Sequence, residues 1–383
     1  MKEFLNEAVY GLQRSAIREF SKLAKNTPGC IALTLGEPDA DTPAPVVSAA
    51  CNSLNSGETH YIENNGSAAL RSKIAAYEKQ KHNLEYSPDE IIVTAGATEA
   101  LFIALMGIIN PGDEVIIPTP AFVLYQEIVK LCRGVPVCLD TCADGFQING
   151  AKLNALMNDR TKAIVLNTPN NPTGCVYGMQ SLENVHAAVS GKPVFVLCDD
   201  VYRELSYCED LHSFAEFTDV REQIIVIQSY SKPWAMTGWR MGYLMAVADV
   251  KERLELIHQF SVVSTPAPFQ KAAIEALDFD CAPLRETYRK RRDYVLERLN
   301  AMGLETVVPQ GAFYVFPSIE KFSLSSADFC RRMISEAGLA GTPGYCFGAE
   351  GYIRFSYAAS DEKLIEGMNR LESFIKKLER ERA

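Results

Sequence analysis

Five short apolar runs between residues 90 and 245 are the feature that most restricts the fold of this chain. They are rich in valine and isoleucine and apolar at successive positions, which is typical of strands buried on both faces of a parallel sheet. The segments between them have helical spacing. The pattern predicts an α/β domain with a mostly parallel, doubly wound sheet. The runs are IIVTAG (91–96), EVIIPTP (114–120), AIVLNTP (163–169), VFVLCDD (194–200) and IIVIQSY (224–230).

The length of 383 residues points to two domains, since single hydrophobic cores stop growing near roughly 250–300 residues. After about residue 285 the sequence changes to a long charged helix, followed by the strand-like segments GAFYVFP (311–317) and GYIRFSYA (351–358). We therefore expect a large domain over 46–284. A smaller α+β domain is expected from residues 1–45 together with residues 285–383. No Gly/Ser-rich linker separates the two, so they are expected to pack around a shared cleft.

Charge, cysteine usage and hydropathy exclude several classes of function. A net charge of −10 without a basic cluster argues against nucleic acid as a partner. No run approaches the ~18 apolar residues of a membrane span, and the N-terminus lacks the apolar core of a signal peptide. The eleven cysteines are scattered without a CxxC pair, which favours a reducing cytoplasm. The five histidines are isolated, so no metal site is predicted.

Polar residues follow four of the five predicted strands at the point where each ends. The first run leads into a small-residue turn at 94–98, and the third leads into the NNPTG turn at 170–174. The fourth ends in Asp199 and Asp200, and the fifth leads to Lys232. Ligands of open α/β sheets gather beyond the carboxyl ends of the strands. These residues are therefore expected to form a binding site at one edge of the sheet.

The segment SYSKPWAMTGWRMG (229–242) resembles the cofactor-lysine motif of the class I/II aminotransferases, pyridoxal-phosphate-dependent enzymes of fold type I. Ser229, Lys232 and Arg240 match that motif in spacing. Further motifs follow the family's order from LGEPDADTP (35–43) to IRFSYA (353–358). The resemblance implies that pyridoxal 5'-phosphate is the cofactor and that Lys232 holds it as an internal aldimine.

The same resemblance assigns the groups around the cofactor ring. Asp199 lies beside the pyridine nitrogen, where its negative charge raises the pKa of that nitrogen. Tyr202, in the DxxY pattern, and Asn171 bind the ring oxygen, and Phe122 stacks on the ring. Lys232, Asp199 and Tyr202 are the predicted catalytic residues.

The cofactor phosphate is expected at the start of the helix that follows the first strand. Ala97 and Thr98 lie in that first turn, where free N–H groups and the helix dipole favour an anion. Arg240 offers a rigid two-pronged donor, and Ser229 adds a hydroxyl. Tyr61, in THYIENNG, matches a tyrosine that reaches the phosphate of the neighbouring subunit, which implies a homodimer.

Three residues are assigned to the substrate by resemblance. Arg354 matches the arginine that binds the α-carboxylate as a bidentate pair. Gly36 brings a backbone N–H close to the same carboxylate, and Asn171 helps to hold it. The loop from Pro343 to Arg354 is shorter than the family usually has, and the position of Asp200 is more often glutamate in relatives.

The leading interpretation is an aminotransferase that moves the amino group of an L-amino acid to a 2-oxo acid, with Lys232 as general base and acid. A carbon–sulfur β-lyase is the alternative, although such relatives often carry histidine at the position of Tyr202. Transcription regulators that contain this fold need an N-terminal winged-helix domain, whereas here the resemblance begins by about residue 30. Some relatives that use dicarboxylic amino acids carry a basic residue at the position of Thr98. The absence of a basic residue at this position disfavours aspartate as the amino donor. Glutamate, aromatic and aliphatic amino acids all remain candidate donors.

Overall fold

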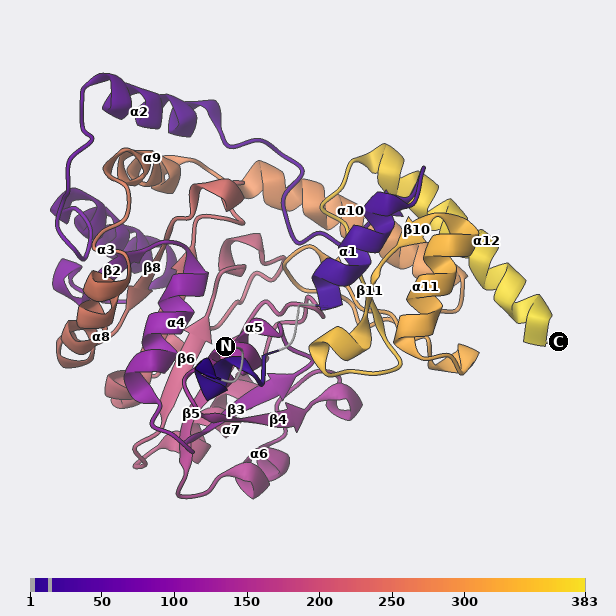
Figure 1. Cartoon of the computed structure of the whole chain (residues 1–383), viewed down its shortest axis with the longest axis horizontal. Helices are drawn as coiled ribbons and strands as arrows, with labels where there is room; N and C mark the ends of the chain where they lie inside the picture. The colour runs from indigo at the N-terminus through magenta and orange to yellow at the C-terminus, as the bar shows by residue number, and fades with distance from the viewer. Residues whose placement is uncertain (1–3, 13–15, 383) are drawn as a thin grey trace.

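The computed structural model describes residues 4–12 and 16–382. A seven-stranded sheet forms the centre of the larger part of the molecule, on the left of Figure 1. Its strand order is β2-β8-β7-β6-β5-β3-β4, and only the pairs that involve β8 are antiparallel. The mostly parallel sheet is therefore confirmed. The strands are β2 (Ile91–Thr94), β3 (Glu114–Thr119), β4 (Val135–Asp140), β5 (Thr161–Asn167), β6 (Phe195–Asp199), β7 (Ile224–Ser229) and β8 (Gly242–Met245).

The five apolar runs form five of these strands, and two strands were not predicted. The runs became β2, β3, β5, β6 and β7, whose residues are almost all buried. The strand β4 lies at the edge of the sheet and is partly exposed, so it lacks a continuous apolar run. The strand β8 is four residues long and directly follows the lysine motif. The partial exposure of β4 explains why it gave no continuous apolar run.

Helices cover both faces of the large sheet, as a doubly wound fold requires. The side chains of Ile91 and Val93 belong to the hydrophobic cluster on one face, and that of Ile92 belongs to the cluster on the other. The first face is covered by α2 (Ala44–Asn55), α3 (Ala68–His82), α6 (Gly150–Leu156), α7 (Met179–Val189) and α9 (Ala267–Asp278). The second is covered by α4 (Ala97–Ile108), α5 (Leu124–Leu131) and α8 (Ala248–Ser261).

The N-terminal arm and the last third of the chain form a second unit, on the right of Figure 1. Strand β1 pairs in parallel with β10, and β11-β12-β9 form a small antiparallel sheet. The N-terminal arm is thus paired with the C-terminal third through β1 and β10. The unit contains α1 (Ala16–Asn26), β1 (Ile31–Ala32), α10 (Ala282–Ala301), β9 (Tyr314–Val315), α11 (Ser326–Ala337), β10 (Leu339–Ala340), β11 (Thr342–Pro343), β12 (Ile353–Ser356) and α12 (Asp361–Arg382).

The expected domain boundaries fall inside helices. Residue 46 lies in the first turn of α2, and residue 285 lies in the first turn of α10. Along residues 4–12 and 16–382, no helix is both long and apolar enough to cross a membrane. In the same part of the chain, no group of three or more histidine, cysteine, aspartate or glutamate side chains is arranged to hold a metal ion. All eleven cysteines are free thiols.

Candidate active site

A cavity of about 430 Å³ opens at the carboxyl ends of the parallel strands. The large sheet with α4 and α5 lines one side of it, and α1, β9 and β12 line the other. The cavity brings together eleven of the twelve residues predicted for the site, all except Tyr61. They are Gly36, Ala97, Thr98, Phe122, Asn171, Asp199, Tyr202, Ser229, Lys232, Arg240 and Arg354.

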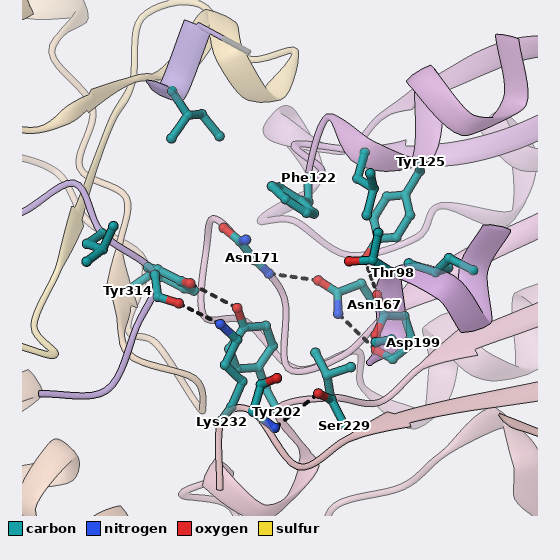
Figure 2. A pocket seen from close by; sticks show the side chains of 18 of the residues that line it. Thr98, Phe122, Tyr125, Asn167, Asn171, Asp199, Tyr202, Ser229, Lys232 and Tyr314 are labelled. Carbon is teal, nitrogen blue, oxygen red and sulfur yellow. Dashed lines mark hydrogen bonds between the residues drawn. The ribbon is translucent and has the colours of Figure 1, made fainter. Parts of the chain in front are cut away.

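Lys232 follows the carboxyl end of β7 and points into the cavity (Figure 2). The turn that carries it is fixed by the Ser229 hydroxyl, which accepts a hydrogen bond from the Ser231 N–H over 3.1 Å. The Lys232 Nζ donates to the Gly36 carbonyl over 2.6 Å. Burial lowers the pKa of the Lys232 amine to about 8, and the charges of Arg240 and Arg354 add to this effect. The neutral amine, the form that attacks an aldehyde carbon, is therefore more populated near neutral pH than in an ordinary lysine.

Asp199 is the last residue of β6, and its carboxylate is buried at the bottom of the cavity. Its Oδ2 accepts a hydrogen bond from the Tyr125 hydroxyl over 2.6 Å, and its backbone carbonyl accepts one from the Asn167 amide over 2.9 Å. Its Oδ1 has no hydrogen-bond partner among the described residues. Burial raises the pKa of Asp199 to about 7, and the neighbouring Asp200 carboxylate acts in the same direction. Asp199 therefore presents one free acceptor to a ligand.

A buried ion network anchors the segment that follows Asp199. The Arg203 guanidinium lies 2.8 Å from a Glu78 carboxylate oxygen and 3.5 Å from one of Asp200. Tyr243, on β8, donates a hydrogen bond to Glu78 over 2.5 Å. Because this network ties 199–203 to α3 and to β8, it fixes the backbone that carries Asp199 and Tyr202.

Two tyrosines and an amide form the wall opposite Asp199. The Tyr202 and Tyr314 hydroxyls lie 2.9 Å apart and form a hydrogen bond, which is drawn as a dashed line in Figure 2. The Asn171 N–H donates to Asn167 Oδ1 over 2.9 Å, which orients the NNPTG turn. The Asn171 side-chain oxygen in turn accepts from Arg354 over 2.8 Å.

Arg354, on β12, is a buried cation without a carboxylate partner among the described residues. Besides its bond to Asn171, it donates to the Thr34 carbonyl over 2.6 Å, while its Nε has no partner within the same part of the chain. The rings of Tyr314 and Phe347 flank the guanidinium at 4.5 Å and 4.8 Å. Burial lowers the pKa of Arg354 below its ordinary value. Since a buried charge is costly unless it is paired, the site is suited to an anionic ligand.

The turn at 95–98, together with Ser229 and Arg240, forms a second anion-binding corner of the cavity. Gly96 has a φ of +80°, which favours glycine, and a Cβ there would lie 2.6 Å from the Arg240 guanidinium. Arg240 donates to the Ala95 carbonyl over 3.4 Å and so lies against the turn. The helix α4 begins at Ala97, so its unpaired N–H groups face this corner.

Tyr61 does not line the cavity of its own chain. Its side chain is 87% exposed on the loop between α2 and α3. A single chain therefore leaves the predicted role of Tyr61 at the neighbouring subunit untested.

The cavity also contains side chains that sequence reasoning missed. Asn167 is the last residue of β5 and follows the same strand-end rule that pointed to Asp199. Tyr125 lies three residues after Phe122, and Tyr314 lies within GAFYVFP (311–317), but no pattern separates them from core aromatics. Arg18, on α1, lines the mouth of the cavity, and only the fold brings it there.

The chain belongs to the family of class I and II aminotransferases, whose sequence model matches residues 28–371. A Bacillus subtilis protein named as a probable N-acetyl-LL-diaminopimelate aminotransferase is 41% identical, over 98% of this chain and 97% of that protein. The solved aspartate aminotransferase of Thermotoga maritima superposes with a TM-score of 0.93 at 34% identity, covering 97% of this chain and 100% of that chain. The aromatic aminotransferase of Pyrococcus horikoshii superposes with a TM-score of 0.89 at 38% identity, covering 94% and 99%.

The chain is therefore an enzyme of amino-group transfer, within the pyridoxal-phosphate-dependent transferases of fold type I. The relatives are named for aspartate, aromatic and N-acetyl-diaminopimelate substrates, and all are aminotransferases. The lyase alternative is not favoured.

The burial of Asp199 predicts a pH-dependent stability of the cofactor-free protein. Its pKa of about 7 in the folded chain exceeds the 3.8 of an unfolded aspartate, so the folded chain binds more protons between these values. Stability should therefore fall as pH rises from about 4 to about 7, by at most about 1.4 kcal/mol per pH unit. Urea unfolding of the wild type and of Asp199→Asn, at matched pH values, isolates this contribution. Parallel stability profiles for the two proteins would refute it.

Proposed function

We propose that this aminotransferase binds pyridoxal 5'-phosphate through Lys232 and moves the amino group of an L-amino acid to a 2-oxo acid. The observation that carries the proposal is the composition of the cavity. Three groups face the same space: a lysine with a lowered pKa, a buried carboxylate and a buried arginine. Within residues 4–12 and 16–382, the carboxylate keeps one oxygen without a donor and the arginine has no carboxylate partner. These three groups suit an aldehyde, a protonated ring nitrogen and a substrate carboxylate respectively.

The residues present fit the cofactor at each end. The Asp199 Oδ1 lacks a donor among the described residues and so offers an acceptor for a protonated pyridine nitrogen. The 95–98 turn, Ser229 and Arg240 supply donors and positive charge for the phosphate. Phe122 lines the cavity between these groups and suits the face of a ring. When bound, pyridoxal phosphate draws electrons from the substrate's α-carbon and so eases loss of the α-hydrogen.

Lys232 is proposed to move the proton that this chemistry releases. Its Nζ already forms a hydrogen bond to Gly36, which also lines the cavity, so the amine lies beside the backbone proposed to border the substrate. A pKa near 8 lets the amine act as a base and return the proton as an acid at neutral pH. Tyr202 and Asn171 are proposed to donate to the cofactor's ring oxygen. The contact of Tyr202 with Tyr314 holds its ring in place.

Arg354 is proposed to orient the substrate through its α-carboxylate. Its Nη1 bonds to Asn171 and its Nη2 to the Thr34 carbonyl, which keeps the guanidinium in one orientation. Gly36 allows a close approach here, since a Cβ at this position would lie 2.3 Å from the Tyr314 hydroxyl. The substrate carboxylate is therefore expected between Arg354 and the backbone at Gly36.

Arg18 is proposed to bind an acidic substrate side chain. After the proposed roles of Lys232, Arg240 and Arg354, it is the fourth cation that lines the cavity. It is exposed, and no carboxylate among the described residues pairs with it. The cavity walls near it contain the apolar side chains of Ile17 and Leu35. Glutamate, with its acidic end at Arg18, and an aromatic amino acid both suit this combination.

The enzyme is further proposed to be a homodimer in which Tyr61 reaches the partner's cofactor phosphate. Tyr61 is 87% exposed, and Phe260 and Val263, on and after α8, are 85% and 45% exposed. Large apolar side chains that gather on a surface are typical of subunit contacts. A second copy of the chain is the partner that the family resemblance implies.

The domain division and the compartment also remain proposals. A large domain over 46–284, with a small domain of 1–45 and 285–383, is supported by a separate hydrophobic cluster that contains α10, α11 and α12. A cytoplasmic location is supported by the eleven free thiols, since oxidising compartments favour disulfides.

Substitution of Arg354 tests the proposed reaction. Arg354→Lys keeps the positive charge but loses the guanidinium group that can bind a carboxylate through two parallel hydrogen bonds. The KM for amino acid donors, measured with 2-oxoglutarate, should therefore rise and kcat should fall, each by about tenfold or more. Amines without an α-carboxylate should be affected much less. Arg289→Lys, which alters an exposed ion pair with Glu286, is the matched control. Equal losses for amino acids and simple amines would assign Arg354 a structural role only.

Substitution of Arg18 tests the substrate side chain. Arg18→Met should raise the KM for glutamate by about tenfold, because one charge-assisted hydrogen bond is lost, and leave that for phenylalanine nearly unchanged. Lys22→Met removes the same charge from the same helix outside the cavity lining and is the control. If the two donors respond alike to Arg18→Met, the proposed contact with the acidic side chain is wrong.

A further inference from the structure

A buried histidine on α8 lies between two segments that the proposed function assigns to cofactor phosphate. His258 has no solvent exposure. Its Nδ1 lies 2.7 Å from Glu99 Oε1, and its Nε2 lies 2.7 Å from the Asn64 carbonyl oxygen. Glu99 belongs to the first turn of α4, and Asn64 belongs to the loop that carries Tyr61. Figure 1 shows α8 beside α4, consistent with the contacts between these helices.

We propose that His258 is a positioning residue for the cofactor phosphate, which holds the 95–98 turn of its own chain and the Tyr61 loop in fixed relation. The inference rests on the proposed function, since Tyr61 is there assigned to the phosphate of the partner subunit. It adds a link between the two phosphate sites of the dimer. In each chain, His258 would fix both the 95–98 turn, which serves the chain's own phosphate site, and the Tyr61 loop, which serves the phosphate site of the partner subunit.

Hydrogen bonds hold His258 at both ring nitrogens. A carbonyl oxygen only accepts, so Nε2 carries a hydrogen toward Asn64. Nδ1 lies 2.7 Å from one oxygen of the Glu99 carboxylate, and the second oxygen accepts the N–H of Ala95. The ring therefore bridges the first turn of α4 and the loop that carries Tyr61.

On the side of its own chain, the bridge reaches the phosphate-binding corner in two steps. Glu99 holds the N–H of Ala95, and the carbonyl of Ala95 accepts a hydrogen bond from the Arg240 guanidinium over 3.4 Å. Ala97 and Thr98 follow directly and line the cavity. A shift of the Glu99 carboxylate would therefore move the backbone N–H groups proposed to hold the phosphate.

On the other side, the bridge fastens the loop close to Tyr61. The carbonyl of Asn64 accepts from His258, while its side-chain amide donates to the Val263 carbonyl over 2.7 Å. The end of α8 thus holds Asn64 by both its backbone and its side chain. Tyr61 lies three residues earlier, and its exposed ring has no hydrogen bond of its own among the described residues. The position of that ring then depends on how Asn64 is held.

A histidine that only stabilises the core would give different results from a positioning residue. Its removal would lower the melting temperature and weaken the binding of every cofactor form alike. A positioning role for the phosphate instead predicts a selective loss. Pyridoxal phosphate should bind more weakly, whereas pyridoxal, which lacks the phosphate, should bind nearly as before.

The experiment compares the dissociation constants of pyridoxal phosphate and pyridoxal, measured by absorbance after removal of the native cofactor. His258→Gln keeps one hydrogen-bond donor but loses the ring that bonds to Glu99 and Asn64 at once. Its dissociation constant for pyridoxal phosphate should rise by about tenfold or more, with less than about a threefold change for pyridoxal. Glu99→Gln alters the same contact from the other side, and the same selective loss is expected should His258→Gln fail to fold. His186→Gln, at a half-buried histidine that lies 2.7 Å from Asp219 and outside the proposed site, is the control.

A double-mutant cycle with Tyr61→Phe tests the link to the loop. If His258 acts partly through Tyr61, the effects of the two substitutions on pyridoxal phosphate binding should add to less than their sum. Strict additivity overturns the link, and equal losses for pyridoxal phosphate and pyridoxal in His258→Gln overturn the positioning role. If Tyr61→Phe alone leaves phosphate binding unchanged, the proposed role of Tyr61 fails. In that case, a loss of pyridoxal phosphate binding without a loss of pyridoxal binding in His258→Gln would still support the role of His258 at the 95–98 turn.

Discussion

The parallel direction of six strands is the constraint on which the rest of the structure depends. Because only β8 runs against its neighbours, the carboxyl ends of β5, β6 and β7 meet at one edge of the sheet. The last residues of these strands, Asn167, Asp199 and Ser229, consequently face one cavity, although they lie far apart in the sequence. The helix α4 starts at the same edge, after β2, and adds its N-terminus. The shared strand direction therefore brings polar residues from separate strand ends together in one site.

The charged groups of the site are not paired with one another, which leaves them available to ligands. Arg354 is buried without a carboxylate partner in the described part of the chain, and Asp199 keeps one oxygen without a donor there. Each arrangement costs free energy in the cofactor-free protein, because buried charges are stable only when they are paired. Networks outside the cavity hold the backbone in place, such as that of Arg203 with Glu78 and Asp200. Ion pairs around the site therefore stabilise its backbone, whereas Arg354 and Asp199 inside the site are expected to find their partners in bound ligands.

Much of this fold was predictable from the sequence, for reasons that particular segments make clear. The strands β3 and β7 are buried on both faces, so they needed continuous apolar runs that are easily recognised. The edge strand β4 is mostly exposed or half-buried, with only Leu139 buried, and gave no such run. Site residues in motifs, such as Lys232 and Arg354, were found through their spacing and family resemblance. The contacts of His258 span 159 and 194 residues, and no local pattern encodes a partner at that distance.

The proposed chemistry requires that Lys232 is the residue that binds the cofactor. Borohydride reduction of the enzyme loaded with pyridoxal phosphate, followed by proteolysis and mass spectrometry, locates the modified lysine. We expect a single pyridoxyl-lysine in the peptide that contains residues 229–240, and its loss in Lys232→Ala. Modification of a different lysine, or an unmodified Lys232 in protein that retains the cofactor, would contradict this assignment.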